Sequence, residues 1–169
     1  MKIDLKEIIN IKNKKQLEKF KLDKPIEFSN YLFHYLIIFN KLDILQLENF
    51  PIYKENDDGL NGFFLAAKKN NIPILKYLLN EYQDYIYNTN EIGDMFINFL
   101  EPKSILKILN KKLDLELLLK HRISPENNKD IVLDSILLNC NFNELQKLFN
   151  LYKPKKYPLN YLFINYKLN

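Results

Sequence analysis

The sequence predicts an all-α protein built from successive helical hairpins, and three observations lead to this prediction. Residues 59–80 carry apolar side chains at helical spacing in two short runs, separated by Asn70 and Asn71. A turn of the same kind recurs along the chain, marked by Leu42, Ile72, Leu113, Phe142 and Leu168. Finally, 47% of the 169 residues are hydrophobic, which is enough for one continuous core.

The hairpin at residues 59–80 shows the pattern most clearly. Its first run contains Ala66 and Ala67, whose small side chains let a second helix lie close. The break falls at Asn70, because asparagine tolerates the left-handed backbone that ends a helix where glycine is absent. We therefore predict a helix on each side of this turn.

Set beside the pattern G-x-T-P-L-H-x-A-A-x-x-G-H-x-x-I-V-x-x-L-L, this segment resembles one ankyrin repeat. The match covers Gly59, the Ala66–Ala67 pair and a ridge in the second helix formed by Ile74, Leu75, Leu78 and Leu79. The segment departs from the pattern in having Asn61–Gly62 for Thr-Pro, Phe64 for His, and Asn70 for Gly.

The resemblance implies one ankyrin-like solenoid domain over residues 1–169, with about four recognisable repeats and degenerate caps. We place the N-terminal cap at 1–28, the repeats at 29–58, 59–90, 103–129 and 130–158, and a partial repeat or C-terminal cap at 159–169. The recurring turns are 30, 41, 29 and 26 residues apart. This spacing is nearer to the ~33 residues of ankyrin than to the ~40–47 of HEAT or armadillo repeats.

Three local expectations follow within this scheme. Ser29–Asn30 is placed to cap the first helix of the first repeat. His34 stands where the family carries its histidine, so the resemblance implies that it hydrogen-bonds backbone between neighbouring repeats. Residues 81–101 are interpreted as an irregular finger, longer than usual, with Ser104–Asn110 as the first helix of the next hairpin.

Composition and charge limit the classes of partner and the cellular compartment that we expect for this chain. The net charge is only +4 and Arg122 is the only arginine, which disfavours general nucleic-acid binding. A single cysteine, Cys140, cannot form an internal disulfide, and this favours a reducing compartment. The N-terminus lacks the apolar run of a signal peptide, and the longest apolar stretch, residues 31–39, is too short to span a bilayer. We expect an intracellular, cytoplasmic monomer without a membrane partner.

No residues form a recognisable catalytic or metal-binding set. The two histidines, His34 and His121, have no cysteine or carboxylate at ligand spacing, and Cys140 has no histidine base beside it. The carboxylate pair Asp57–Asp58 lies in an expected loop, where a solvated turn explains it. We therefore expect no enzyme activity, no metal and no cofactor.

The resemblance implies a protein–protein interaction module or adaptor that binds another protein through its concave face and inter-repeat fingers. The residues expected to contact this partner are Tyr53, Asn56, Asp57, Tyr82, Tyr85, Tyr87 and Asn90. The residues expected to be structural are Gly59, Ala66, Ala67, Asn70 and His34.

An alternative is nucleic-acid association through the lysine-rich termini. No acidic residue follows Glu144, and the lysines beyond it are interleaved with tyrosines. The heavy use of Asn, Lys and Ile also indicates an AT-rich genome. In this the chain resembles the ankyrin proteins of giant DNA viruses of amoebae, which implies action on host factors in the host cytoplasm. Protists and intracellular bacteria are the rival sources.

Overall fold

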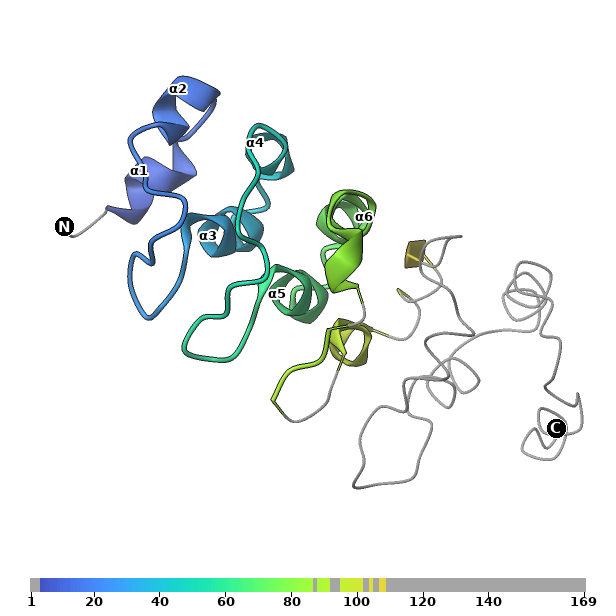
Figure 1. Cartoon of the computed structure of the whole chain (residues 1–169). Helices are drawn as coiled ribbons and strands as arrows, with labels where there is room; N and C mark the ends of the chain where they lie inside the picture. Colours follow the sequence, from blue (N-terminus) through green and yellow to red (C-terminus); the bar gives the residue numbers. More distant parts are fainter. Residues whose placement is uncertain (1–3, 87, 92–94, 102–103, 105–106, 109–169) are drawn as a thin grey trace, which may run out of the picture.

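A computed structural model describes residues 4–86, 88–91, 95–101, 104 and 107–108 (Figure 1). Regular secondary structure in these residues is helical, apart from two isolated bridges that pair Glu27 with Asn30 and Thr89 with Met95. The elements are α1 (Leu5–Ile9), α2 (Lys14–Leu17), α3 (Leu32–Ile38), α4 (Leu42–Leu45), α5 (Gly62–Lys68), α6 (Ile72–Glu81), η1 (Gln83–Tyr85) and η2 (Phe96–Phe99). The prediction of a helical protein is therefore confirmed for this part. The repeats expected at 130–158, the segment 159–169 and nearly all of 103–129 lie outside the described residues.

The helices form two rows. In Figure 1, α2, α4 and α6 lie along one side, and α3 and α5 lie along the other. Helix α3 contacts both α4 and α5, and α5 contacts both α6 and η2. Successive hairpins thus pack side by side, with their first helices in contact.

The turns inside the two hairpins have the same backbone. Asn40 and Asn70 have positive φ angles of 54° and 50°. The next amide donates back into the preceding helix in both cases, from Lys41 to the Leu36 carbonyl and from Asn71 to the Ala66 carbonyl, each at 2.8 Å. This is the 6→1 bond of a helix that ends in a left-handed residue. The helix end predicted at Asn70 therefore recurs thirty residues earlier at Asn40.

Asparagine also begins both helices of the second hairpin. The Asn61 side chain accepts from the backbone amides of Phe63 and Phe64, at 3.0 and 3.2 Å. The Asn71 side chain accepts from the amide of Ile74 at 3.2 Å. Asn61 thus satisfies the free amides of the first turn at the position where the ankyrin pattern has threonine.

The cap expected at Ser29–Asn30 is wrong. Helix α3 begins after Tyr31, whose backbone amide donates to Nδ1 of His34 at 2.9 Å. Ser29 has a φ of 54° and belongs to a tight turn that the Asn30 amide closes on the Glu27 carbonyl. The chain therefore turns two residues too early for Ser29 to reach the helix amides.

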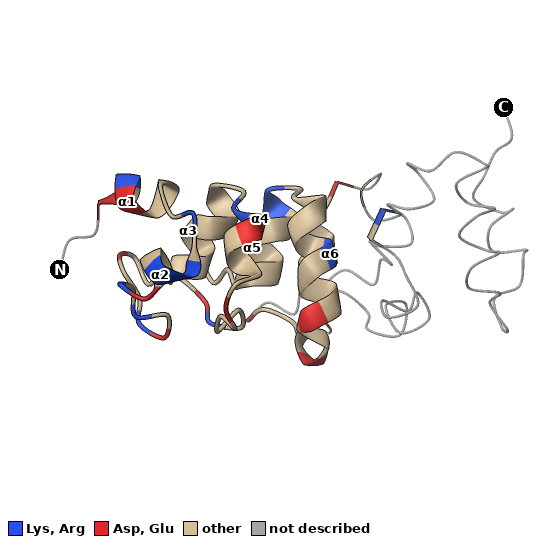
Figure 2. Ribbon diagram, turned by 90° about the horizontal axis from the view of Figure 1, so that it is seen from above, with Lys and Arg blue, Asp and Glu red and all other residues tan. Residues whose placement is uncertain are grey.

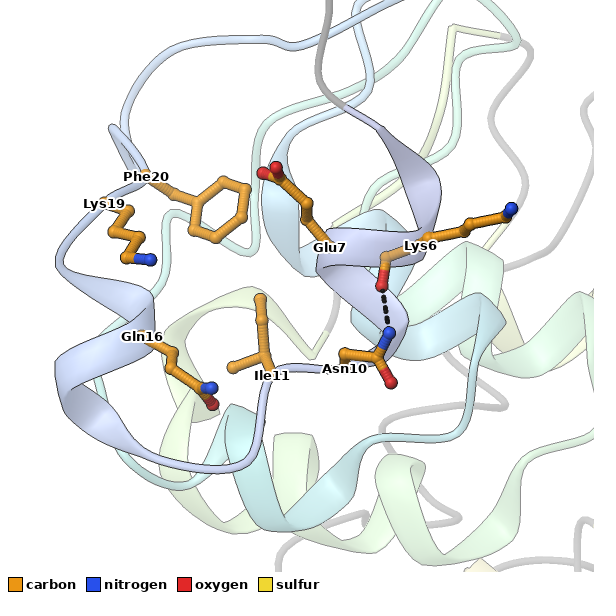
Figure 3. Close-up of a pocket in the computed structure, with 7 residues that line it drawn as sticks. All are labelled: Lys6, Glu7, Asn10, Ile11, Gln16, Lys19 and Phe20. Atoms are coloured by element: carbon orange, nitrogen blue, oxygen red, sulfur yellow. Dashed lines mark hydrogen bonds between the residues drawn. The ribbon is translucent and has the colours of Figure 1, made fainter.

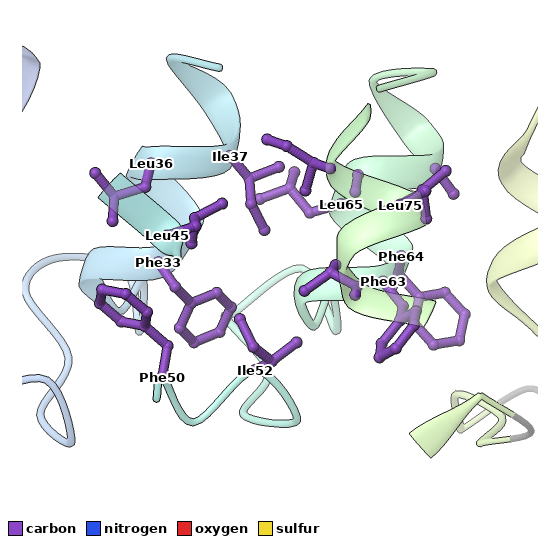
Figure 4. Close-up of a cluster of buried hydrophobic side chains, with 14 of the residues drawn as sticks. Phe33, Leu36, Ile37, Leu45, Phe50, Ile52, Phe63, Phe64, Leu65 and Leu75 are labelled. Atoms are coloured by element: carbon purple, nitrogen blue, oxygen red, sulfur yellow. The ribbon is translucent and has the colours of Figure 1, made fainter. Parts of the chain in front are cut away.

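A continuous apolar core fills the space between the two rows (Figure 4). Phe33 and Phe63 occupy equivalent places in α3 and α5, and both are buried with Leu36 and Ile37. Ala66 and Ala67 are also fully buried, so the alanine pair lies at a packed surface.

The end of the expected long finger is instead part of the core. Met95, Phe96 and Ile97 are buried, and η2 packs on α5. The ring centroids of Phe63 and Phe96 lie 5.4 Å apart, as do those of Phe64 and Phe99. The interpretation of 81–101 as irregular finger throughout is therefore wrong for its last residues. The segment 96–99 is stacked on α5 as α5 is stacked on α3. Ser104, Lys107 and Ile108, the described residues of the helix expected at 104–110, are helical.

Gly62 tests the closeness of this packing. A Cβ added there would lie 2.5 Å from Cγ2 of Ile52 and 3.3 Å from the Ile52 carbonyl oxygen. We expect Gly62→Ala to lower the free energy of unfolding by about 1–3 kcal/mol, because the branched Ile52 side chain cannot move aside. Helix propensity alone predicts the opposite, a gain of about 1 kcal/mol. Urea unfolding measures the difference, with Lys68→Ala in the same helix as control. An unchanged or raised stability would contradict the packing described.

Candidate functional site

Three loops extend from the same side of the molecule, next to α3, α5 and η2 (Figure 1). We call them finger loop 1 (residues 23–30), finger loop 2 (53–60) and finger loop 3 (82–86 and 88–91). Hydrogen bonds join the first two. The Asn56 side-chain amide donates to the Asn30 side-chain oxygen at 2.9 Å, and the Asp57 backbone amide donates to the Phe28 carbonyl at 3.2 Å. The two loops therefore hold each other in place.

Asn56 also shapes its own loop. Its side-chain oxygen accepts from the amides of Asp58 and Leu60, at 3.1 and 3.0 Å. Gly59 follows with a φ of 67°, a conformation that glycine adopts without strain. This asparagine, expected to contact a partner, is half-buried and organises finger loop 2 from within.

Aromatic stacking joins finger loops 2 and 3. The rings of Tyr53 and Tyr85 lie 5.2 Å apart at an interplanar angle of 14°. The ammonium group of Lys54 lies 5.5 Å from the centroid of the Tyr53 ring. Tyr53 is 46% exposed, so this pair presents aromatic surface to solvent.

The most exposed large apolar side chain of the described residues is Phe28, at 77%. It lies at the tip of finger loop 1 with a φ of 50°, which is an unusual conformation for a bulky residue. The sequence pattern does not single out this residue, because a phenylalanine before Ser29 is typical of ordinary apolar sequence. We call the exposed side chains of Phe28, Tyr53, Glu55, Asp57 and Asp58, together with the half-buried Tyr85, the finger surface.

The other expected contact residues are placed differently. Tyr82 is half-buried, and its hydroxyl accepts from the Phe50 amide at 3.2 Å. Its ring meets that of Tyr77 edge-on at 6.2 Å, and burial raises the pKa of both tyrosines. Tyr82 therefore packs between hairpins. Asn90 is half-buried in finger loop 3, and Tyr87 lies outside the described residues.

His34 connects the two hairpins from inside. Its ring is completely buried, and Nε2 lies 2.8 Å from the Leu60 carbonyl oxygen. Since Nδ1 accepts the Tyr31 amide proton, Nε2 carries the ring proton and donates to Leu60. Burial lowers the pKa of His34 from 6.5 to about 4, and the Leu60 carbonyl opposes this shift. His34 is thus a structural group that is neutral at pH 7.

Two hollows lie away from the finger surface. One, of about 290 Å³, lies between α1 and the segment 16–20, with Ile11 and Phe20 at its centre and Lys6, Glu7 and Lys19 at its edge (Figure 3). The other, of about 440 Å³, lies beside Tyr77 and Tyr82 and is bordered by Glu48 and Glu81. Both are open and mixed in polarity. Within the residues that the structure describes, no three His, Cys, Asp or Glu side chains are grouped to hold a metal ion.

The lysine-rich N-terminus carries both signs of charge, and Figure 2 shows basic and acidic residues together in α1. Lys6 and Glu7 are neighbours in the sequence of this helix. Lys14 forms an ion pair of 2.7 Å with Glu48, and this contact raises the pKa of the lysine. The lysines beyond Glu144 lie outside the described part, as do His121 and Cys140.

Comparison of the chain with known protein families, with characterised proteins and with solved structures found no match. None of the helices in the described ranges is sufficiently long and apolar to cross a membrane.

The buried His34 predicts a specific pH dependence. Its pKa is lower in the folded state than in the unfolded chain, so unfolding takes up a proton between pH 6.5 and about 4. Stability is therefore full above pH 6.5 and falls as the pH drops through this window, by about 3 kcal/mol.

Urea unfolding at several pH values measures this loss. In His34→Gln the side chain can still accept from Tyr31 and donate to Leu60, yet it does not titrate. We expect a clearly smaller loss of stability across the window in the variant, while the carboxylates contribute equally to both proteins. Parallel pH profiles for the two proteins would be inconsistent with the environment described for His34.

Proposed function

We propose that this chain is an ankyrin-like repeat protein that acts as an intracellular interaction module or adaptor, binding another protein through the finger surface. The architectural part is supported by two hairpins that share one turn geometry thirty residues apart, at Asn40 and Asn70. It is further supported by His34, which hydrogen-bonds the backbone of the next hairpin as the histidine of ankyrin repeats does.

The observation that carries the functional part is the exposure of Phe28 and Tyr53 on loops that are fixed to one another. Large aromatic side chains are frequent anchors of protein interfaces, since they bury much area with little loss of conformational freedom. Hydrogen bonds hold Phe28 beside finger loop 2, and stacking on Tyr85 holds Tyr53 beside finger loop 3. A surface fixed before binding loses less entropy when a partner arrives.

The finger surface lies on exposed loops and combines aromatic rings with carboxylates, so it suits an extended partner better than a small molecule. Within this proposal the protein acts in the cytoplasm, which is the host cytoplasm if the chain is viral. The alternative, nucleic-acid association, gains no specific support from the described residues, and the same experiment tests it.

Site-specific photo-crosslinking tests the finger surface. With a benzophenone amino acid at position 28 or 53, we expect the full chain to form an adduct with a protein in cell extract. The matched control carries the same group at Leu47, which follows α4, is 38% exposed and lies outside the finger loops. Equal labelling from position 47, or adducts that nuclease rather than protease removes, would count against the proposal.

Phe28→Asn separates binding from stability. Asparagine tolerates a positive φ better than phenylalanine, and the ring at this position is mostly in solvent. We expect the midpoint of urea unfolding to stay the same or to rise, while capture of the crosslinked partner falls severalfold. Leu47→Ala provides the control for loss of an exposed apolar side chain. A Phe28→Asn protein that is less stable and binds normally would assign the ring a structural role instead.

A further inference from the structure

We infer that the partner seats a basic segment, an extended stretch containing Lys or Arg side chains, on the finger surface. This inference rests on the proposed function and specifies the chemistry of the occupant. Three features of the finger loops support it: their acidic charge, the absence of ion-pair partners for the same carboxylates, and a tyrosine ring that faces a cation.

Charge is distributed unevenly over the molecule. Finger loop 1 carries Asp23 and Glu27 against Lys24, and finger loop 2 carries Glu55, Asp57 and Asp58 against Lys54. Finger loop 3 carries Asp84 and Glu91 with no lysine in its described residues. The lysines lie mostly elsewhere. Examples are Lys41, Lys68 and Lys69 at the turns that end α3 and α5, and Lys14 and Lys15 in α2. The finger loops therefore form an acidic face on a chain whose net charge is +4.

The carboxylates of finger loop 2 are not engaged in ion pairs within the described residues. The ion pair found among the described residues joins Lys14 to Glu48, away from the finger loops. In the same part of the chain no lysine lies within ion-pair distance of Glu55, Asp57 or Asp58, and all three are exposed. An arriving ammonium or guanidinium group can thus pair with them without displacing an existing partner.

The aromatic part of the surface also suits a cation. The Lys54 ammonium lies 5.5 Å from the centroid of the Tyr53 ring, within the range of cation–π attraction. An incoming Lys or Arg can take the place of Lys54 over this ring, while Phe28 contacts the aliphatic part of the segment. Lys54 is then a competitor of the partner.

The effect of Lys54→Gln on affinity distinguishes a basic partner from an acidic one. If the occupant is basic, Lys54→Gln removes a repelling charge and frees the ring, so affinity rises. If the occupant is acidic, or is a nucleic acid, the same change removes an attractive charge and affinity falls. The double change Asp57→Asn, Asp58→Asn acts in the reverse direction in each case.

The experiment measures binding of short synthetic peptides to the full chain by fluorescence anisotropy. One peptide alternates lysine and arginine with leucine and alanine, and its two matched versions carry glutamate or glutamine at every basic position. We expect binding of the basic peptide alone, with affinity raised about two- to fivefold in Lys54→Gln. We expect it lowered about three- to tenfold in the double Asp→Asn variant and weakened by salt between ~0.05 and ~0.5 M.

Specific docking is distinguished from general attraction by Phe28→Asn, which keeps every charge. Its affinity for the basic peptide must fall at least severalfold, and Leu47→Ala must bind normally. Preference for the acidic or the neutral peptide, or unchanged binding in Phe28→Asn, overturns the inference. If crosslinking from position 28 still yields a protein adduct in that case, the proposed function stands and the basic chemistry alone is wrong. If no adduct forms either, both are wrong.

Discussion

The buried ring of His34 is the contact on which the geometry of the described residues depends most. Its Nδ1 accepts from the amide of Tyr31, the residue before α3, and its Nε2 donates to the Leu60 carbonyl twenty-six residues later. The Leu60 amide in turn bonds to Asn56, whose side chain reaches Asn30 in the preceding loop. One side chain therefore fixes the start of a helix and, through Leu60, the path of finger loop 2. Because both ring nitrogens are engaged at a site that is buried from solvent, loss of either contact would leave a buried polar backbone group unsatisfied.

The contact between α5 and η2, which follows next along the chain, contains no histidine. Phe64 occupies the position thirty residues after His34, and its ring meets Phe99 edge-on. Apolar contacts of this kind stabilise by burial, and they fix direction less strictly than two hydrogen bonds. Finger loop 3 is accordingly joined to finger loop 2 by the stacking of Tyr53 and Tyr85. The finger surface is held by hydrogen bonds at one end and by aromatic contacts at the other.

The sequence predicted the parts of the fold that have a local signal. The period of the apolar residues located α5 and α6, and an asparagine at the break located the left-handed turn at Asn70. It did not predict η2, because four residues of 3₁₀ helix are too few to show a period, and their burial depends on contacts with α5 that are distant in sequence. It missed Phe28 for a related reason, since backbone conformation at a loop tip depends on bonds to another loop.

At the tip of finger loop 1, an unfavourable backbone conformation coincides with an exposed aromatic side chain. Phe28 and Ser29 both have left-handed backbone, which costs roughly 1–2 kcal/mol for each residue with a side chain. Three backbone hydrogen bonds offset this cost: Ile26 to Asn30 at 2.7 Å, Asn30 to Glu27 at 2.8 Å, and Asp57 to Phe28 at 3.2 Å. These bonds involve only main-chain groups, so a glycine or an asparagine at position 28 would keep them and relieve the strain. The phenylalanine ring contributes almost nothing to the core, since 77% of its surface is in solvent. Phe28 is thus a bulky aromatic residue in strained backbone, on a loop whose hydrogen bonds do not require its side chain, and this combination is the reason for proposing that the ring contacts a partner.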